Sequence, residues 1–426
     1  MIRDVGLLML ARVVMSGTRA LAGIIVPIYL ALIGFNAVRL GTLFAVTALT
    51  SAALTASIGI LSDRLGRKVF VVGLPLLTAV AAVAFILSRN LAVIFACAAL
   101  GSFGRGAGAG GGAVGPYAPA EQAYIADATP SVVRNTVFGR LAFASAVGAV
   151  IGNLLAAVPD LAARLGLHGT AAYRPAFLIV GLLALAAGLL AVPITNRKAA
   201  PRPSGGRAWN LSRPSRGMLL RLWATNSVNG LAMGFIGPFI TYWFYRRYGV
   251  GPGTIGVLYT VINLATLASI LAAAPVAHRL GLVRTVVIGR TFQALLLIPM
   301  VLAPTFWMAG VVYLVRMCAQ RIAMPLRQSF VMAMVPSEER GTVAGLSNLP
   351  AQATSVMSPT LAGYLFEHVS LALPFEVGAL FQLMNTALFY AFFRRVRPPE
   401  ERAPSERSAT AGPVAAEAAD LRRHAS

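Results

Sequence analysis

The sequence predicts an all-α membrane protein of twelve transmembrane helices, arranged as two six-helix halves that repeat one another. Hydrophobic residues make up 57% of the 426 residues and charged residues only 12%, too little charge to coat a soluble chain of this length. The apolar residues also fall in blocks of roughly 20 or more, long enough to cross about 30 Å of hydrocarbon as helix.

These apolar blocks divide the chain into two bundles. We expect an N-terminal bundle over residues 1–195, a flexible cytoplasmic linker over 196–217, a C-terminal bundle over 218–397 and a disordered cytoplasmic tail over 398–426. The linker is rich in Arg, Pro, Ser and Gly. The expected spans are residues 5–33, 40–61, 69–88, 90–126, 136–158, 175–195, 218–245, 254–275, 284–303, 306–335, 342–366 and 373–394.

The placement of the basic residues indicates topology. The net charge of +22 comes almost wholly from arginine, since Lys68 and Lys198 are the only lysines. The arginines gather in the loop after the second span, in the linker and after the last span, and the opposite loops are poorer in them. By the positive-inside rule both termini face the cytoplasmic side of a cell inner membrane. Because the basic residues flank the expected spans, the expected partner is the lipid bilayer and not nucleic acid.

The two halves share residues in register. The run Thr129–Gly139 matches Val335–Gly345 at a constant offset of 206, the difference between Arg340 and Arg134. Two further matches are Pro119–Gln122 with Pro325–Gln328 at the same offset, and Gly23-x-x-x-Pro27 with Gly234-x-x-x-Pro238 at an offset of 211. Two bundles related by an axis along the membrane normal can rock about a site between them.

A charged loop motif closes the second span. The run Gly59-Ile60-Leu61-Ser62-Asp63-Arg64-Leu65-Gly66-Arg67-Lys68 ends a helix with an acid, a glycine turn and a basic cluster. This run closely resembles the loop motif of the major facilitator superfamily. The resemblance implies a gating latch between the halves, made by Gly59, Asp63, Arg64, Gly66, Arg67 and Lys68. In the second copy, Ala274–Gly281, His278 replaces the acid, which puts a C-terminal latch in doubt.

The fifth span carries a second, partial resemblance, to the drug and metabolite antiporters of the same superfamily. Gly139, Gly148 and Gly152 keep the glycine spacing of their fifth-span pattern, but Asn153 stands where proline is expected. The resemblance favours export. Small residues at helical spacing are equally explained by tight helix packing in lipid, and both interpretations stay open.

The resemblance implies a secondary transporter that moves a small molecule by alternating access. The competing interpretations are a non-transporting receptor or scaffold on the same fold, and a facilitator or exchanger that needs no gradient. We expect no enzyme activity, metal or cofactor, because the spans hold no nucleophile–base pairing, no ligand cluster and no phosphate-binding loop. The expected state is a monomer.

Arginines at mid-membrane depth are the candidate binding residues. Arg19, Arg105 and Arg316 fall near the middle of the first, fourth and tenth spans, which line the central cavity in this architecture. Guanidinium groups pair with carboxylates, so the pattern favours an anionic substrate. Pairing inside the protein is the alternative. Further candidates are Arg321 of the tenth span, and Asn226 and Asn229 of the seventh, which either face the cavity or bond neighbouring helices.

Glu121 is the only carboxylate placed inside a span and not at its mouth, and it is therefore the candidate proton carrier. It occupies the position in its half that Arg327 occupies in the other, so an ion pair between them is the structural alternative. Arg12 and Arg140 lie nearer helix ends, where we expect their side chains to reach the membrane surface. The Gly106–Gly115 tract predicts either a broken fourth helix beside Arg105 or a tightly packed one.

Overall fold

The computed structural model describes residues 2–88, 90–101, 131–195, 212–271, 281–333 and 346–394, together with 103, 117, 121, 122, 124, 125, 129, 275, 276, 279, 335 and 343. Within these residues all the regular elements are helices, and each of the twelve expected spans contains helix. Seven of the described helices are long and apolar enough to cross a membrane. The tail and the Gly106–Gly115 tract lie outside the described residues, so their predictions stay predictions.

The described helices fall into the two halves of the chain. The N-terminal half contains α1 (Ile2–Leu32), α2 (Ala37–Leu65), α3 (Arg67–Leu87), α4 (Leu91–Leu100), α6 (Ser131–Leu155), α7 (Val158–Arg164), a 3₁₀ turn η1 (Gly169–Tyr173) and α8 (Arg174–Ala191). The C-terminal half contains α9 (Arg213–Ile236), α10 (Ile240–Tyr248), α11 (Pro252–Leu271), α13 (Leu282–Leu295), α14 (Leu297–Leu302), α15 (Phe306–Ala333), α17 (Leu349–His368) and α18 (Leu373–Phe393).

Two features of the helices differ from the sequence prediction. Helix α9 begins at Arg213, inside the expected linker, with Pro214 in its first turn, where proline is well tolerated. The seventh span is interrupted between α9 and α10 at Gly237 and Pro238, because proline cannot donate to the carbonyl four residues earlier. The matching Pro27 lies inside an unbroken α1.

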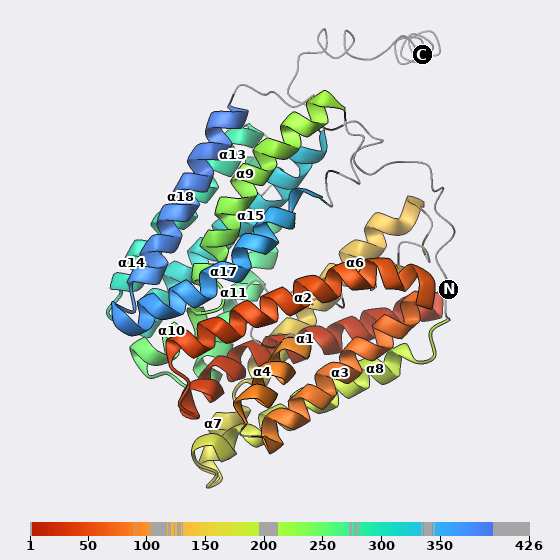
Figure 1. Cartoon of the computed structure of the whole chain (residues 1–426), viewed down its shortest axis with the longest axis vertical. Coiled ribbons are helices and arrows are strands. Elements are labelled where there is room, and N and C mark those ends of the chain that lie inside the picture. Colours follow the sequence, from red (N-terminus) through yellow and green to blue (C-terminus); the bar gives the residue numbers. More distant parts are fainter. Residues whose placement is uncertain are drawn as a thin grey trace.

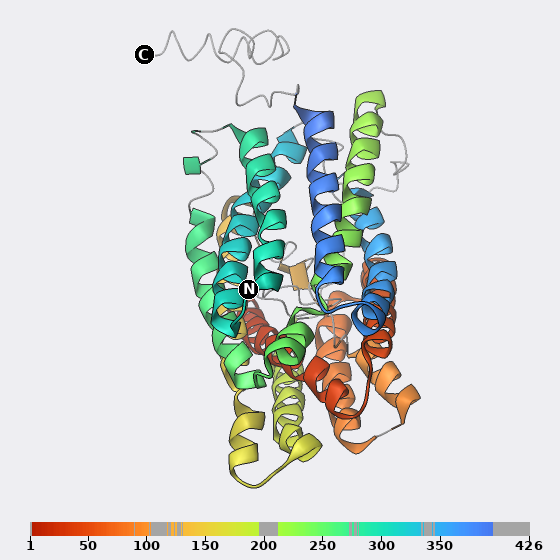
Figure 2. The same ribbon diagram turned by 90° about the vertical axis from the view of Figure 1, so that its left-hand side faces the viewer.

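The two halves meet at one end of the molecule and diverge at the other (Figure 1). Helices α1 and α9 begin, and α8 and α18 end, on the diverging side, which we name the termini end. The opposite end, where α2 and α18 begin and α17 ends, is the closed end. In the turned view of Figure 2 the helices of the C-terminal half, green to blue, lie largely above those of the N-terminal half.

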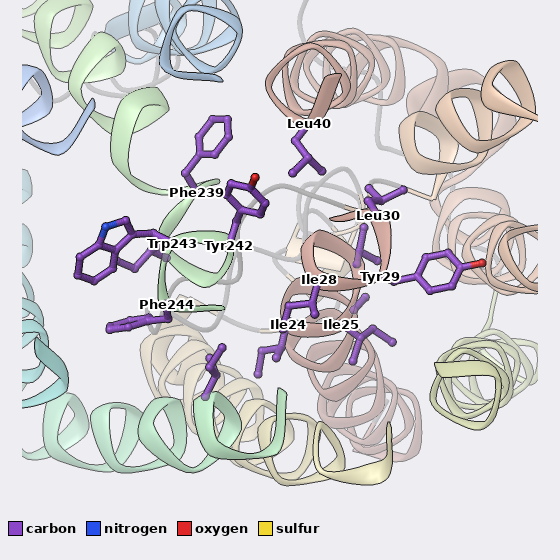
Figure 3. Packing of buried hydrophobic residues seen from close by; sticks show 14 of the residues in the cluster. Ile24, Ile25, Ile28, Tyr29, Leu30, Leu40, Phe239, Tyr242, Trp243 and Phe244 are labelled. Carbon is purple, nitrogen blue, oxygen red and sulfur yellow. The ribbon is translucent and has the colours of Figure 1, made fainter. Parts of the chain in front are cut away.

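The hydrophobic cores show the same asymmetry. At the closed end one core joins both halves, with Ile24, Tyr29 and Phe44 of the first half packed with Phe239 and other aromatic residues of the second. Figure 3 shows labelled side chains of α1 and of the α9–α10 segment within this cluster. At the termini end each half has a core of its own among the described residues, one around Tyr117 and one around Leu222. The halves are therefore joined only over part of their length.

Glycines in the two inter-helix loops repeat the same backbone geometry. Gly66 precedes α3 with φ 88° and ψ 146°, and Gly281 precedes α13 with φ 80° and ψ 151°. Residues with a Cβ rarely adopt this conformation, which explains why both copies of the loop motif keep glycine there. The structure thus confirms the repeat of the halves at the level of single residues.

Small residues let helices approach closely within each half. A Cβ on Gly148 would collide with the Val13 carbonyl of α1, and one on Gly152 with the Gly17 carbonyl. In the C-terminal half, Gly230 of α9 packs equally closely against α17. Packing thus accounts for Gly148 and Gly152, two of the three glycines of the fifth-span pattern, in line with one of the two interpretations left open by the sequence.

A substitution on α6 tests this packing. Gly152→Val is expected to destabilise the protein by about 1–3 kcal/mol, because α1 must move away from α6 to admit the side chain. Gly139→Val is the matched control, since a Cβ at Gly139 meets nothing within 4 Å. The measurement is the melting temperature of the purified variants in detergent. Equal melting temperatures for the two variants would contradict the packing argument.

Candidate functional site

Backbone contacts between α2 and α17 hold the closed end together. A Cβ on Gly41 would collide with the Pro359 carbonyl, and one on Gly363 with the Ala37 carbonyl. Helices α6 and α11 cross in the same way, since a Cβ on Gly256 would collide with the Asn153 carbonyl. Each of these pairs joins one half to the other. At the closed end the two halves are therefore held together by helices in backbone contact.

Two carboxylate side chains at the closed end also form hydrogen bonds between the halves. Asp160 of α7 accepts a hydrogen bond from the Gly253 amide at the start of α11, at 2.9 Å. Glu367 of α17 accepts one from the Ala37 amide at the start of α2, at 3.0 Å. Each carboxylate thus caps a helix N-terminus of the opposite half, where the free amides and the helix dipole favour negative charge. The positions correspond in the repeat, with offsets of 367 − 160 = 207 and 253 − 37 = 216.

A buried ion pair joins α1 to the fourth span. Arg12 Nη1 lies 2.5 Å from Glu121 Oε2, and the two side chains are 7% and 0% exposed. The prediction that Arg12 reaches the membrane surface is wrong. Its side chain turns inward because a buried carboxylate needs a partner. Arg140 of α6 is exposed, as expected.

Glu121 has further polar surroundings. Its Oε1 makes no hydrogen bond within the described residues. The buried hydroxyl of Tyr117, one turn earlier, makes none there either. The alternative pairing of Glu121 with Arg327 is wrong, because Arg327 donates to Asn226 instead. Within the described residues, Glu121 therefore has one carboxylate oxygen paired with Arg12 and one without a hydrogen-bond partner.

The C-terminal half contains a polar network between four helices. Asn226 of α9 donates to the Ser347 carbonyl at 2.5 Å and accepts from Arg327 of α15. With the Asn385 amide of α18 oriented from its hydrogen-bond network, its nitrogen donates to the Thr225 carbonyl at 2.8 Å and its oxygen accepts from Arg290 of α13 at 2.5 Å. Asn226 is thus engaged between helices, one of its two predicted alternatives.

The other predicted binding residues occupy different settings. Arg316 of α15 is 2% exposed, with its guanidinium carbon 5.9 Å from the centre of the Tyr313 ring and Nη1 3.7 Å from Met317 Sδ. Arg19 of α1, Arg321 of α15 and Asn229 of α9 are half-buried, and Asn229 contacts Asn385. Arg105 lies outside the described residues.

Only part of the predicted latch lies in the described residues. Gly59, Asp63 and Arg64 fall within α2, but their side chains are not described. Gly66 forms the turn, Arg67 begins α3 and is 5% exposed, and Lys68 is half-buried. The termini end thus carries the loop geometry of the motif in a conformation in which the halves diverge.

This arrangement is that of a membrane transport protein: two repeated helical halves, a gate closed at one end and cationic groups in the interior. The chain belongs to the Major Facilitator Superfamily, whose pattern it matches over residues 8–225 and again over 222–425. The family resemblance and the fold class expected from the sequence are both confirmed.

Relatives and solved structures agree with this assignment. The multidrug resistance protein MdtG of Escherichia fergusonii is 23% identical over 389 residues, covering 88% of this chain and 90% of that protein. The MdtG protein of Citrobacter koseri is 24% identical over 386 residues, covering 87% and 90%. Among solved structures, the nucleoside transporter NupG has a TM-score of 0.71 at 13% identity, covering 92% of this chain and 100% of that one.

An inward-facing bacterial homologue of the human lysosomal transporter Spinster has a TM-score of 0.67 at 14% identity, covering 92% and 96% of the two chains. At these identities the solved structures support the fold alone.

Proposed function

We propose that the protein is a secondary transporter that exports small organic anions across the cell inner membrane by alternating access. The observation that carries this proposal is the unequal joining of the halves. One core and two carboxylate caps join them at the closed end, and separate cores lie at the termini end. Rocking of the two halves can separate them at the closed end and bring them together at the termini end.

The charge distribution supports a cytoplasmic termini end. Arg67, Lys68, Arg216 and Arg394 lie at that end, among other basic residues of the loop and helix starts. In this orientation the described conformation opens toward the cytoplasm, ready to take up a substrate from inside the cell. The loop motif would then act as a latch only after the halves have closed around it.

Export is supported by the MdtG relatives, which are named multidrug resistance proteins. An anionic substrate is supported by the interior charges. Glu121 is the described carboxylate deepest in a span, and it already pairs with Arg12, so it offers little to a cationic drug. Arg316 is buried without a described carboxylate, and Arg19 lies on α1, which faces the second half.

Proton coupling through Glu121 is part of the proposal. A carboxylate that releases its arginine partner when it binds a proton can couple the proton gradient to the conformation of the two halves. The competing candidate is a facilitator or exchanger in which the Arg12–Glu121 pair is only structural. The two differ in whether a pH gradient drives flux.

Flux in proteoliposomes tests the proposal. Efflux of radiolabelled benzoate and of tetraphenylphosphonium is measured with and without an imposed pH gradient, for the wild type, Arg105→Ala, Arg316→Ala and the exposed control Arg221→Ala. We expect gradient-driven benzoate flux that falls at least tenfold in the first two variants and persists in the control. Flux of the cation alone would overturn the anion assignment, and flux indifferent to the gradient would favour the facilitator.

A further inference from the structure

We propose that the C-terminal half contains a binding site for a small oxyanion, a free carboxylate or phosphate, inside the bundle formed by α9, α13, α15 and α18. The site lies among helices of one half and not between the halves. Its occupancy can therefore be measured as binding, without flux.

Two arginines converge on this site from different helices. Arg290 of α13 donates to the Asn385 side chain of α18 at 2.5 Å, and Arg327 of α15 donates to Asn226 of α9. Asn385 also donates to the carbonyl of Thr225, the residue before Asn226, so the two arginine contacts lie next to each other on α9. Each guanidinium has five donors, and one asparagine oxygen satisfies few of them, so both arginines retain donors for another acceptor.

The described residues provide no negative charge to balance the pair. Arg12–Glu121, in the other half, is the ion pair found in the part of the chain that the structure describes. The described carboxylates of the C-terminal half are Glu367 and Glu376, and both lie at the closed end. Two cations at bilayer depth are costly unless an anion accompanies them.

Buried glutamines extend the site by one helical turn. Gln382 lies one turn before Asn385 on α18, is 2% exposed, and neither its amide oxygen nor its nitrogen has a hydrogen-bond partner. Gln293 lies one turn after Arg290 on α13, is 4% exposed, and its amide oxygen is also unpartnered. Because α13 and α18 run in opposite directions, both glutamines lie on the same side of the arginines. Unpaired buried amides of this kind call for a ligand.

The repeat explains why the charge is missing. Arg327 occupies the position of Glu121 in the other half, since 327 − 121 = 206. In the N-terminal half that position supplies the carboxylate that neutralises Arg12. In the C-terminal half the same position supplies a second cation, and the facing residue on α9 is the neutral Asn226. An external oxyanion restores the charge balance that Glu121 provides in the first half.

Oxyanions suit these donors better than chloride does. Guanidinium groups bind carboxylate and phosphate oxygens in a bidentate way, with the fork of one group matched to two oxygens. The unpartnered amide nitrogen of Gln382 adds a hydrogen-bond donor one turn further in. A compact oxyanion can therefore contact donors of α13, α15 and α18, while Asn226 of α9 holds Arg327 in place.

Thermal stability of the purified full chain tests the site. The melting temperature is measured while sodium phosphate or sodium acetate replaces sodium chloride at constant ionic strength. Gln382→Glu is the decisive variant, because it is nearly isosteric, sacrifices no described side-chain hydrogen bond and supplies the missing carboxylate. Arg327→Gln removes one cation. Arg221→Gln and Asn348→Asp make the same charge changes at exposed positions.

We expect at least one oxyanion to raise the melting temperature of the wild type and of both controls by about 2 °C or more. In Gln382→Glu this rise is expected to disappear, while the melting temperature in chloride is at least that of the wild type. Arg327→Gln is expected to weaken oxyanion binding at least tenfold. An oxyanion response retained in Gln382→Glu, or absent from the wild type, would overturn the site. Loss of anion flux with an intact oxyanion response would count against the proposed function alone.

Discussion

Arg12→Gln is expected to destabilise the protein by about 3–5 kcal/mol at neutral pH, because it leaves the Glu121 carboxylate buried without its partner. The wild-type pair is 2.5 Å apart and almost fully buried, so water cannot replace the lost guanidinium. Protonation of Glu121 would remove its charge, so the loss of stability is expected to shrink as the pH is lowered from 8 to 5. The measurement is the melting temperature across this pH range.

A double-variant cycle isolates the pair. Arg12→Gln with Glu121→Gln removes both charges, and the double variant is expected to be more stable at pH 8 than Arg12→Gln alone. Arg140→Gln is the control for loss of an exposed arginine. If Arg12→Gln and Arg140→Gln have equal effects, the ion pair contributes nothing to stability. If Glu121→Gln also transports with no response to a pH gradient, the proton-carrier role of Glu121 gains support.

The helices and the repeat could be predicted from the sequence, because they depend on residues close together in the chain. Apolar blocks set the spans, and shared residues such as Gly66 and Gly281 revealed the duplication before their common backbone geometry was known. The interruption of the ninth span at Leu296 also has a local cause, since Pro299 follows within the next turn.

Contacts between distant segments could not be predicted in this way. Arg12 was placed at the membrane surface because its position along α1 is visible in the sequence, whereas the direction of its side chain is not. Its partner Glu121 is 109 residues away. The same reason hid the role of Arg327 and Gln382, since only the packing of four helices brings their polar groups into one bundle.

The two cross-half carboxylate caps could not be predicted from the sequence either. Asp160 and Glu367 stand at helix ends, where acidic residues commonly meet water. What the sequence does not show is that each reaches the N-terminus of a helix in the opposite half. The repeat relates these two contacts, so two carboxylate caps of the same kind join the halves at the closed end.

Loss of both carboxylate caps is expected to shift the protein toward the conformation in which the two halves separate at the end where they now meet. Each carboxylate cap of a helix N-terminus contributes about 1 kcal/mol. The two contacts use different residues and helices, so Asp160→Ala with Glu367→Ala is expected to change the equilibrium between the two conformations by about 2 kcal/mol, or roughly thirtyfold. Each single change is expected to shift it roughly fivefold by the same reasoning.

Distances between spin labels measure this shift. In a background with Cys97→Ser and Cys318→Ser, one label pair is placed at the termini end through Val69→Cys and Leu220→Cys, and another at the closed end through Leu165→Cys and Val369→Cys. All four label positions are exposed and belong to opposite halves within each pair. Rocking of the halves requires the two distances to change in opposite senses.

In the double variant we expect shorter distances at the termini end and longer ones at the closed end. Glu376→Ala is the matched control, since it removes an exposed carboxylate at the same end from the first turn of its own helix α18. If both distances stay unchanged, the caps do not hold the gate. If both distances lengthen together, the substitutions have separated the two halves at both ends, and the halves do not rock about each other.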